Sequence, residues 1–125
     1  MSLKSFTAAY IEAALWSSTD NADDSGGEPL DRNYGESDIS RKLRMDIEHD
    51  CAGFYQTYEE IWSDAGWSDE QAGHDFWLSR NGHGAGFFDR NFSGSSLTGD
   101  ALQKAAGAYG TFDLYIGDDG KVHGL

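Results

Sequence analysis

The chain has 125 residues, a formal net charge of −13, and 38% hydrophobic and 14% aromatic residues. This size and apolar content predict a single domain (1–125) with its own core and exclude a disordered acidic tail. The charge argues against direct binding of nucleic acid, because such binding requires Lys and Arg to displace counterions from the phosphates. If the charge serves binding, a basic protein, or one that itself binds nucleic acid, is the natural partner; the alternative is that the acidity only keeps a small protein soluble.

Three further features bear on the cellular context. No apolar run approaches the ~20 residues that a membrane span needs, so no association with a membrane is expected. The N-terminal stretch lacks a basic region followed by an apolar core, so we expect no secretory signal. The chain has one cysteine, which excludes an internal disulfide and suits a reducing cytoplasm.

The first element predicted is an amphipathic helix over residues 5–17, where apolar side chains recur every three or four positions. Residues 18–36 show no periodicity and contain the only proline, so they are predicted to form a long acidic loop. A calcium loop does not fit there. If Gly26 takes the obligatory glycine position of an EF-hand, Arg32 falls where the bidentate glutamate belongs.

A long second helix is predicted over residues 38–64, with Ser37 or Asp38 as its N-cap. Its apolar stripe consists of Leu43, Ile47, Cys51, Phe54, Tyr58, Ile61 and Trp62. Because Cys51 lies on this stripe, we expect a buried, inert thiol and not a nucleophile.

Residues 74–90, HDFWLSRNGHGAGFFDR, are predicted to form a β-hairpin, because Asn81-Gly82 is a strong signal for a type I′ turn. In this register His74 lies opposite Asp89. His74 and His83 then lie at opposite ends of the hairpin, roughly 20 Å apart, which is too far for a shared metal ion.

A third helix is predicted over residues 98–109, with Thr98 as N-cap and Gly110 as a left-handed C-cap. Residues 111–125 read as strand, Asp-Gly turn and strand. The expected fold is therefore α+β, with three helices packed on a small antiparallel sheet of about four strands that two hairpins supply.

Two groups of acidic residues are candidates for binding a partner. The second helix carries Asp46, Asp50, Glu60 and Asp64, and the loop carries Asp20, Asp23, Asp24 and Glu28. The helical acids form like-charge i,i+4 pairs about 6 Å apart along the axis, which is similar to phosphate spacing on a nucleic acid strand. The alternative is a merely solvated helix face.

Four segments carry a resemblance to a known family: AALWSSTD (13–20), GEPLDRNY (27–34), AGHDFWLSRNGHGAGFFDR (72–90) and DLYIGDDGKV (113–122). They resemble a family of small uncharacterised proteins of tailed bacteriophages and prophages, and the resemblance spans most of the chain. The family has no established activity, so no catalytic residue is carried over. The resemblance implies a host bacterial cytoplasm during infection, where small acidic phage proteins often occupy host machinery.

These observations favour a non-enzymatic phage accessory protein, monomeric or homodimeric, that needs no cofactor or metal. It would bind and inhibit a nucleic-acid-handling host protein as a DNA mimic, which would make it an anti-defence factor. One alternative is a small metal-assisted hydrolase centred on the hairpin, with the candidate catalytic residues His74, Asp75, His83 and Asp89. Against it, no Ser or Cys lies in a nucleophile-elbow context.

Another alternative is a module that binds a peptide or a single strand through exposed aromatic side chains. The candidates are Trp67, Trp77 and Phe88. Stacking of bases needs basic neighbours that follow the backbone, and only Arg80 and Arg90 are available for this.

Overall fold

The structure, a computed structural model, describes residues 2–20, 28–32, 34–81, 87, 96–111 and 113–124. Within these ranges the fold is mostly helical. The helices are α1 (Leu3–Ser17), α2 (Arg41–Asp64), α3 (Asp69–Arg80) and α4 (Ser96–Gly107). Short 3₁₀ turns occupy Leu30–Arg32 and Glu36–Asp38.

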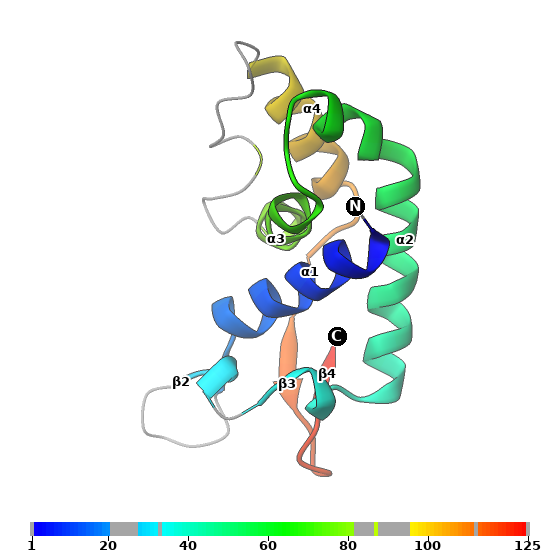
Figure 1. The fold of residues 1–125 in the computed structure, drawn as a ribbon. Helices are drawn as coiled ribbons and strands as arrows, with labels where there is room; N and C mark the ends of the chain where they lie inside the picture. The colour runs from blue at the N-terminus through cyan, green and yellow to red at the C-terminus, as the bar shows by residue number, and fades with distance from the viewer. Residues whose placement is uncertain are drawn as a thin grey trace.

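The strands of the described residues form two separate antiparallel pairs. β1 (Thr19–Asp20) pairs with β2 (Glu28–Pro29), and β3 (Leu114–Ile116) pairs with β4 (Val122–Gly124). The second pair is joined to the helices at Ser40, whose backbone N–H donates to the carbonyl oxygen of Val122 at 2.9 Å. In Figure 1 this pair lies at one end of the molecule, beside the start of α2.

The helices pack around one core. α2 runs along one side of the molecule, and α1 runs across the molecule from α2 (Figure 1). The most extensive helix contact joins α1 to α3, and α4 packs on α3 and α2. None of the helices in the described part of the chain is long and apolar enough to span a membrane.

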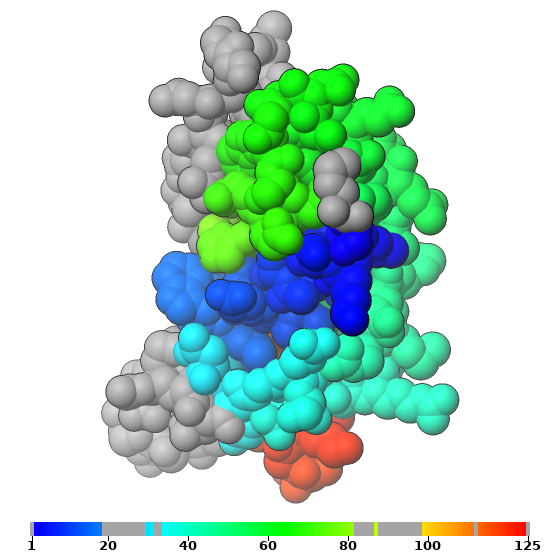
Figure 2. All heavy atoms as spheres, in the orientation of Figure 1, coloured from blue at the N-terminus to red at the C-terminus, as the bar shows by residue number. Residues whose placement is uncertain are grey.

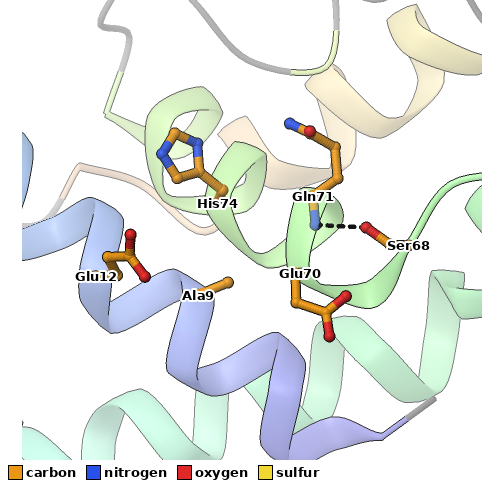
Figure 3. Close-up of a pocket in the computed structure, with 6 residues that line it drawn as sticks. All are labelled: Ala9, Glu12, Ser68, Glu70, Gln71 and His74. Atoms are coloured by element: carbon orange, nitrogen blue, oxygen red, sulfur yellow. Dashed lines mark hydrogen bonds between the residues drawn. The ribbon is translucent and has the colours of Figure 1, made fainter.

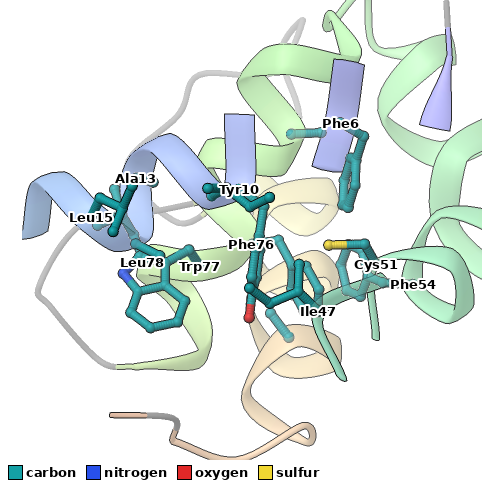
Figure 4. Close-up of a cluster of buried hydrophobic side chains, with 14 of the residues drawn as sticks. Phe6, Tyr10, Ala13, Leu15, Ile47, Cys51, Phe54, Phe76, Trp77 and Leu78 are labelled. Carbon is teal, nitrogen blue, oxygen red and sulfur yellow. The ribbon is translucent and has the colours of Figure 1, made fainter. Parts of the chain in front are cut away.

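Aromatic rings fill the centre of this core. The Phe54 and Phe76 rings stack at 4.1 Å, and the Phe6 and Trp62 rings stack at 5.3 Å, with all four side chains fully buried. Stacked pairs of this kind stabilise a fold by about 1 kcal/mol beyond the area that they bury. Figure 4 shows Cys51 among these rings, as predicted. Burial raises the pKa of its thiol to about 12, so the thiolate is not populated at neutral pH.

Much of the helix prediction is confirmed. α1 and α2 match the predicted ranges 5–17 and 38–64 closely, although Ile61 is 39% exposed and leaves the buried stripe. The N-cap prediction was wrong, because Ser37 and Asp38 belong to a 3₁₀ turn. The α2 cap is Ser40, whose hydroxyl oxygen accepts a hydrogen bond from a backbone N–H three residues later.

The C-terminal predictions hold in part. Strands β3 and β4 form the predicted hairpin, with Gly120 at φ +76° in its turn. α4 begins two residues earlier than predicted, so Thr98 lies within the helix and is not its N-cap. Gly110 does adopt a positive φ, +81°, but it lies three residues beyond the last helical residue.

The hairpin predicted for residues 74–90 was wrong, and with it the fold of three helices on a sheet of about four strands. Residues 74–80 lie in α3, a fourth helix, and the remainder apart from Asn81 and Phe87 lies outside the described residues. Asn81 is the C-cap of α3, and its backbone N–H donates to the carbonyl oxygen of Trp77. The N-cap of α3 is Ser68, whose hydroxyl accepts from the N–H of Gln71 at 3.1 Å.

The α1–α3 contact depends on a glycine. A Cβ built on Gly73 would lie 2.1 Å from the carbonyl oxygen of Phe6, which is far inside van der Waals contact. The backbones of α1 and α3 can therefore approach this closely only because position 73 has no side chain.

We expect Gly73→Ala to destabilise the fold by roughly 1–3 kcal/mol or more, because the methyl group meets backbone that cannot rotate away. The matched control is Gly107→Ala in α4, where an added Cβ meets nothing within 4 Å. That change should be neutral or stabilising by up to about 1 kcal/mol. Urea denaturation of both variants measures the difference, and equal midpoints would contradict the close-contact account.

Candidate functional site

Arg80, the last residue of α3, is 5% exposed and connects four parts of the fold. Its Nη1 donates to the Asp50 carboxylate on α2 at 2.9 Å and to the hydroxyl of Tyr10 on α1 at 3.1 Å. Its Nε and Nη2 donate to the carbonyl oxygens of Gly110 and Tyr109, at 2.9 and 3.0 Å. The guanidinium is therefore held by α1, by α2 and by the turn after α4.

This network changes the interpretation of the acids predicted to bind a partner. Asp50 is the charged partner of a buried guanidinium, so its carboxylate is committed to the fold. Asp46 forms an exposed i,i+4 pair with Lys42 at 3.1 Å. Of the four α2 acids predicted to bind a partner, this leaves Glu60 and Asp64, which are exposed and lie together in the last turns of the helix. The predicted row of pairs is thus reduced to its C-terminal half.

The structure describes only two of the four loop acids predicted to bind a partner. Asp20 and Glu28 are cross-strand partners in the β1–β2 pair, so this pair brings their backbones side by side. Asp23 and Asp24 lie outside the described residues.

The residues proposed for hydrolysis are only partly described. His74 and Asp75 are consecutive in α3, and Nδ1 of His74 lies 3.9 Å from Oδ1 of Asp75. Asp75 is fully buried and accepts a hydrogen bond from Nε2 of Gln71 at 3.4 Å, whereas the His74 side chain is 34% exposed. His83 and Asp89 lie outside the described residues. Among the residues that are described, no three His, Cys, Asp or Glu side chains converge to hold a metal ion.

Two of the three aromatic residues proposed to bind a peptide or a single strand are in the described part. Trp77 is 1% exposed, and its indole N–H donates to the hydroxyl of Ser17 at 2.6 Å, so it cannot stack on a ligand. Trp67 is partly buried against Phe87, with ring centroids 6.2 Å apart. Phe88 lies outside the described residues. Neither Trp67 nor Trp77 is the exposed platform that this alternative needs.

The structure reveals a recess that the sequence did not indicate. It lies between α1 and α3 and has a volume of about 360 Å³ (Figure 3). The residues that line it are Ala9, Glu12, Ser68, Glu70, Gln71 and His74. Glu12 and Glu70 are exposed carboxylates on opposite walls, so this recess is acidic.

The β3–β4 hairpin carries the last histidine of the chain. Nε2 of His123 lies 3.0 Å from Oδ1 of Asp119, and the imidazole stacks on Tyr115 at 5.5 Å. The hydrogen bond with His123 holds the pKa of Asp119 below its usual value. These contacts indicate that His123 and Asp119 stabilise the turn of the hairpin.

Comparison with known proteins adds no identification: no protein family, curated protein or solved structure shows a significant match to this chain. The resemblance to phage proteins therefore stays a prediction, and function must be argued from the residues themselves.

We expect Asp50→Ala to destabilise the fold by about 3 kcal/mol, because it leaves the buried Arg80 guanidinium without its carboxylate. Asp46→Ala is the control, since it removes an exposed pair that contributes at most about 1 kcal/mol. Thermal and urea unfolding would compare the two variants. A loss of stability as small for Asp50 as for Asp46 would show that the network is not central.

The hairpin provides a test by titration. Because the folded-state pKa of Asp119 is lowered, its contribution to stability is present above the unfolded pKa and is lost as pH falls through the folded value. Carbon-13 NMR of the side-chain carboxyl should show titration below the usual aspartate range. His123→Phe keeps a ring over Tyr115 but removes the hydrogen bond, so the pKa of Asp119 should rise. An unchanged titration in this variant would rule out the imidazole as the cause.

Proposed function

We propose that this protein is a non-enzymatic binding protein that engages a basic partner through the C-terminal end of α2. The observation that carries the proposal is the exposure of Glu60 and Asp64 in the last turns of that helix, with no basic residue in its last turn. The C-terminus of a helix already bears a partial negative charge, so each acid there costs about 0.3–1 kcal/mol. Residues that oppose the fold in this way are expected where function requires them.

The whole-molecule charge supports the same proposal. A net charge of −13 on 125 residues attracts basic proteins over distances longer than a single contact. Figure 2 shows α2 forming one edge of the molecule, where a partner can reach it. The carboxylates of Glu60 and Asp64, one turn apart, lie about 6 Å from one another along the axis.

The narrower form of the proposal concerns the partner. We propose a nucleic-acid-handling host protein, inhibited by a phage accessory factor in the bacterial cytoplasm. Support comes from the similarity of this carboxylate spacing to phosphate spacing, and from the four segments that resemble phage proteins. A DNA mimic of this kind occupies the basic surface with which its target binds DNA, so free duplex DNA should compete with it.

The test is a pull-down from bacterial lysate with the wild-type chain and with Glu60→Lys/Asp64→Lys. We expect the wild type to retain nucleic-acid-binding proteins at about 50 mM salt, and to release them at about 300 mM or when duplex DNA is added. The double variant should retain them at least about tenfold less, which corresponds to roughly 1.4 kcal/mol.

Asp113→Lys/Asp118→Lys is the matched control, because it changes the net charge by the same amount at two exposed acids away from the C-terminal end of α2. Circular dichroism would show that both variants fold. Equal loss of binding in the two variants would show that net charge alone causes the effect. Equal retention of every protein in all three samples would refute the proposal.

A further inference from the structure

The turn of the β3–β4 hairpin contains the only Asp-Gly sequence of the chain, at Asp119-Gly120. Such a pair can rearrange, because glycine has no side chain to shield its backbone nitrogen from the preceding carboxyl group. The nitrogen of Gly120 loses its proton and attacks Cγ of Asp119, whose hydroxyl leaves as water, and a cyclic succinimide forms. Water then reopens the ring. Opening at the main-chain carbonyl gives isoaspartate, in which the chain runs through Cγ, and the overall mass is unchanged.

The fold restrains the attacking nitrogen. The N–H of Gly120 donates to the carbonyl oxygen of Gly117 at 3.0 Å, and the N–H of Gly117 donates to the carbonyl oxygen of Lys121 at 2.9 Å. Gly120 also has a φ of +76°, which suits the turn and which residues with a side chain rarely adopt. Because the nitrogen must give up its proton as it attacks, these hydrogen bonds have to open before succinimide can form.

The fold also restrains the carboxyl group that would be attacked. Nε2 of His123 lies 3.0 and 3.2 Å from the two carboxylate oxygens of Asp119, and the N–H of Lys121 donates to Oδ1 at 3.0 Å. The hydrogen bond with His123, followed by that from Lys121, holds the pKa of Asp119 below its usual value. The protonated acid, which alone can release its hydroxyl as water, is therefore rarer than in an ordinary aspartate.

The imidazole of His123 is fixed in this position by its neighbours. It stacks on Tyr115, its cross-strand partner, with ring centroids 5.5 Å apart. A Cβ built on Gly117 would lie 2.5 Å from Cδ2 of His123, so the ring lies against backbone that has no side chain. Since an ionised carboxylate can only accept hydrogen bonds, Nε2 is the donor to Asp119.

We propose that Asp119-Gly120 is a site of isoaspartate formation that the folded hairpin suppresses, and that His123 is the positioning residue that holds the carboxylate back from the nitrogen of Gly120. Isoaspartate lengthens the main chain by one atom between residues 119 and 120, so the turn could not keep its hydrogen bonds. β4 is joined to the start of α2 by the hydrogen bond from Ser40 to Val122. Modification of the turn would therefore loosen that junction as well.

The test keeps the folded chain, and the chain unfolded in guanidinium, at neutral pH and body temperature for several weeks. Trypsin then releases residues 105–121, since Lys104 and Lys121 bound a stretch without another Lys or Arg. The isoaspartate form of this peptide separates by chromatography at unchanged mass, and electron-transfer fragmentation assigns its position.

We expect isoaspartate at residue 119 to form at least about tenfold more slowly in the folded chain, because the turn must first open. Equal rates in the folded and unfolded chains would overturn the proposal. So would the absence of isoaspartate at residue 119 in the unfolded chain.

Variants test the role of His123, and all of them yield the same tryptic peptide. His123→Phe keeps a ring but removes the hydrogen bond, so isoaspartate should form at least about threefold faster in the folded chain. His123→Gln retains an N–H donor and should stay closer to the wild-type rate. The matched control is His49→Phe, at an exposed histidine of α2, which should leave the rate unchanged.

Two results would remove His123 from the proposal: an unchanged rate in His123→Phe, or a rate in His123→Gln as high as in His123→Phe. Circular dichroism would show that each variant keeps its helices. None of the hairpin residues belongs to the C-terminal end of α2, so this experiment and the pull-down have independent outcomes.

Discussion

The buried guanidinium of Arg80 is the interaction on which the arrangement of the helices depends. It lies at the end of α3 and is bonded to Tyr10 on α1, to Asp50 on α2 and to two backbone carbonyls after α4. Its Cζ also lies 5.7 Å from the centre of the Phe76 ring, so the cation is stacked within the aromatic core. A charge taken out of water must find all of its partners, because the penalty for an incomplete set is several kcal/mol.

The same requirement explains why helix packing here is specific. Stacked rings such as Phe54 and Phe76 supply most of the driving force, but apolar burial is not directional. The fork of Arg80 can meet its acceptors in only one arrangement of α1, α2 and the turn after α4. Gly73 adds a second constraint, because it fixes how near α3 comes to Phe6. Together the two features set both the position and the rotation of α3.

The helices that could be predicted from the sequence are those with one buried face. Along α1 and α2, buried and exposed residues alternate with a 3.6-residue period, which can be recognised in the sequence. α3 is buried on nearly every side, from Phe76 and Trp77 to Asp75 and Arg80, and so shows no such period. Because α3 lacks that signal, the prediction relied on the Asn81-Gly82 pair, which is typical of a hairpin turn. Asn and Gly, however, also end helices. The local signal for α3, Ser68 followed by two acids, was present and was outweighed.

The candidate site, too, could be predicted from the sequence only in part. Glu70 and His74 are four residues apart, so they could be placed on one face of α3 once that helix was known, as Glu12 could be placed on a face of α1. That the two faces oppose one another depends on the α1–α3 contact, which no local pattern encodes. Asp50 and Glu60 look equivalent in the sequence, since both are acids on one long helix. In the structure, Asp50 pairs with the buried Arg80 and so belongs to the fold, whereas Glu60 is exposed to solvent. For an acidic protein such as this one, charges available to a partner can be recognised only after the charges that the fold consumes have been assigned.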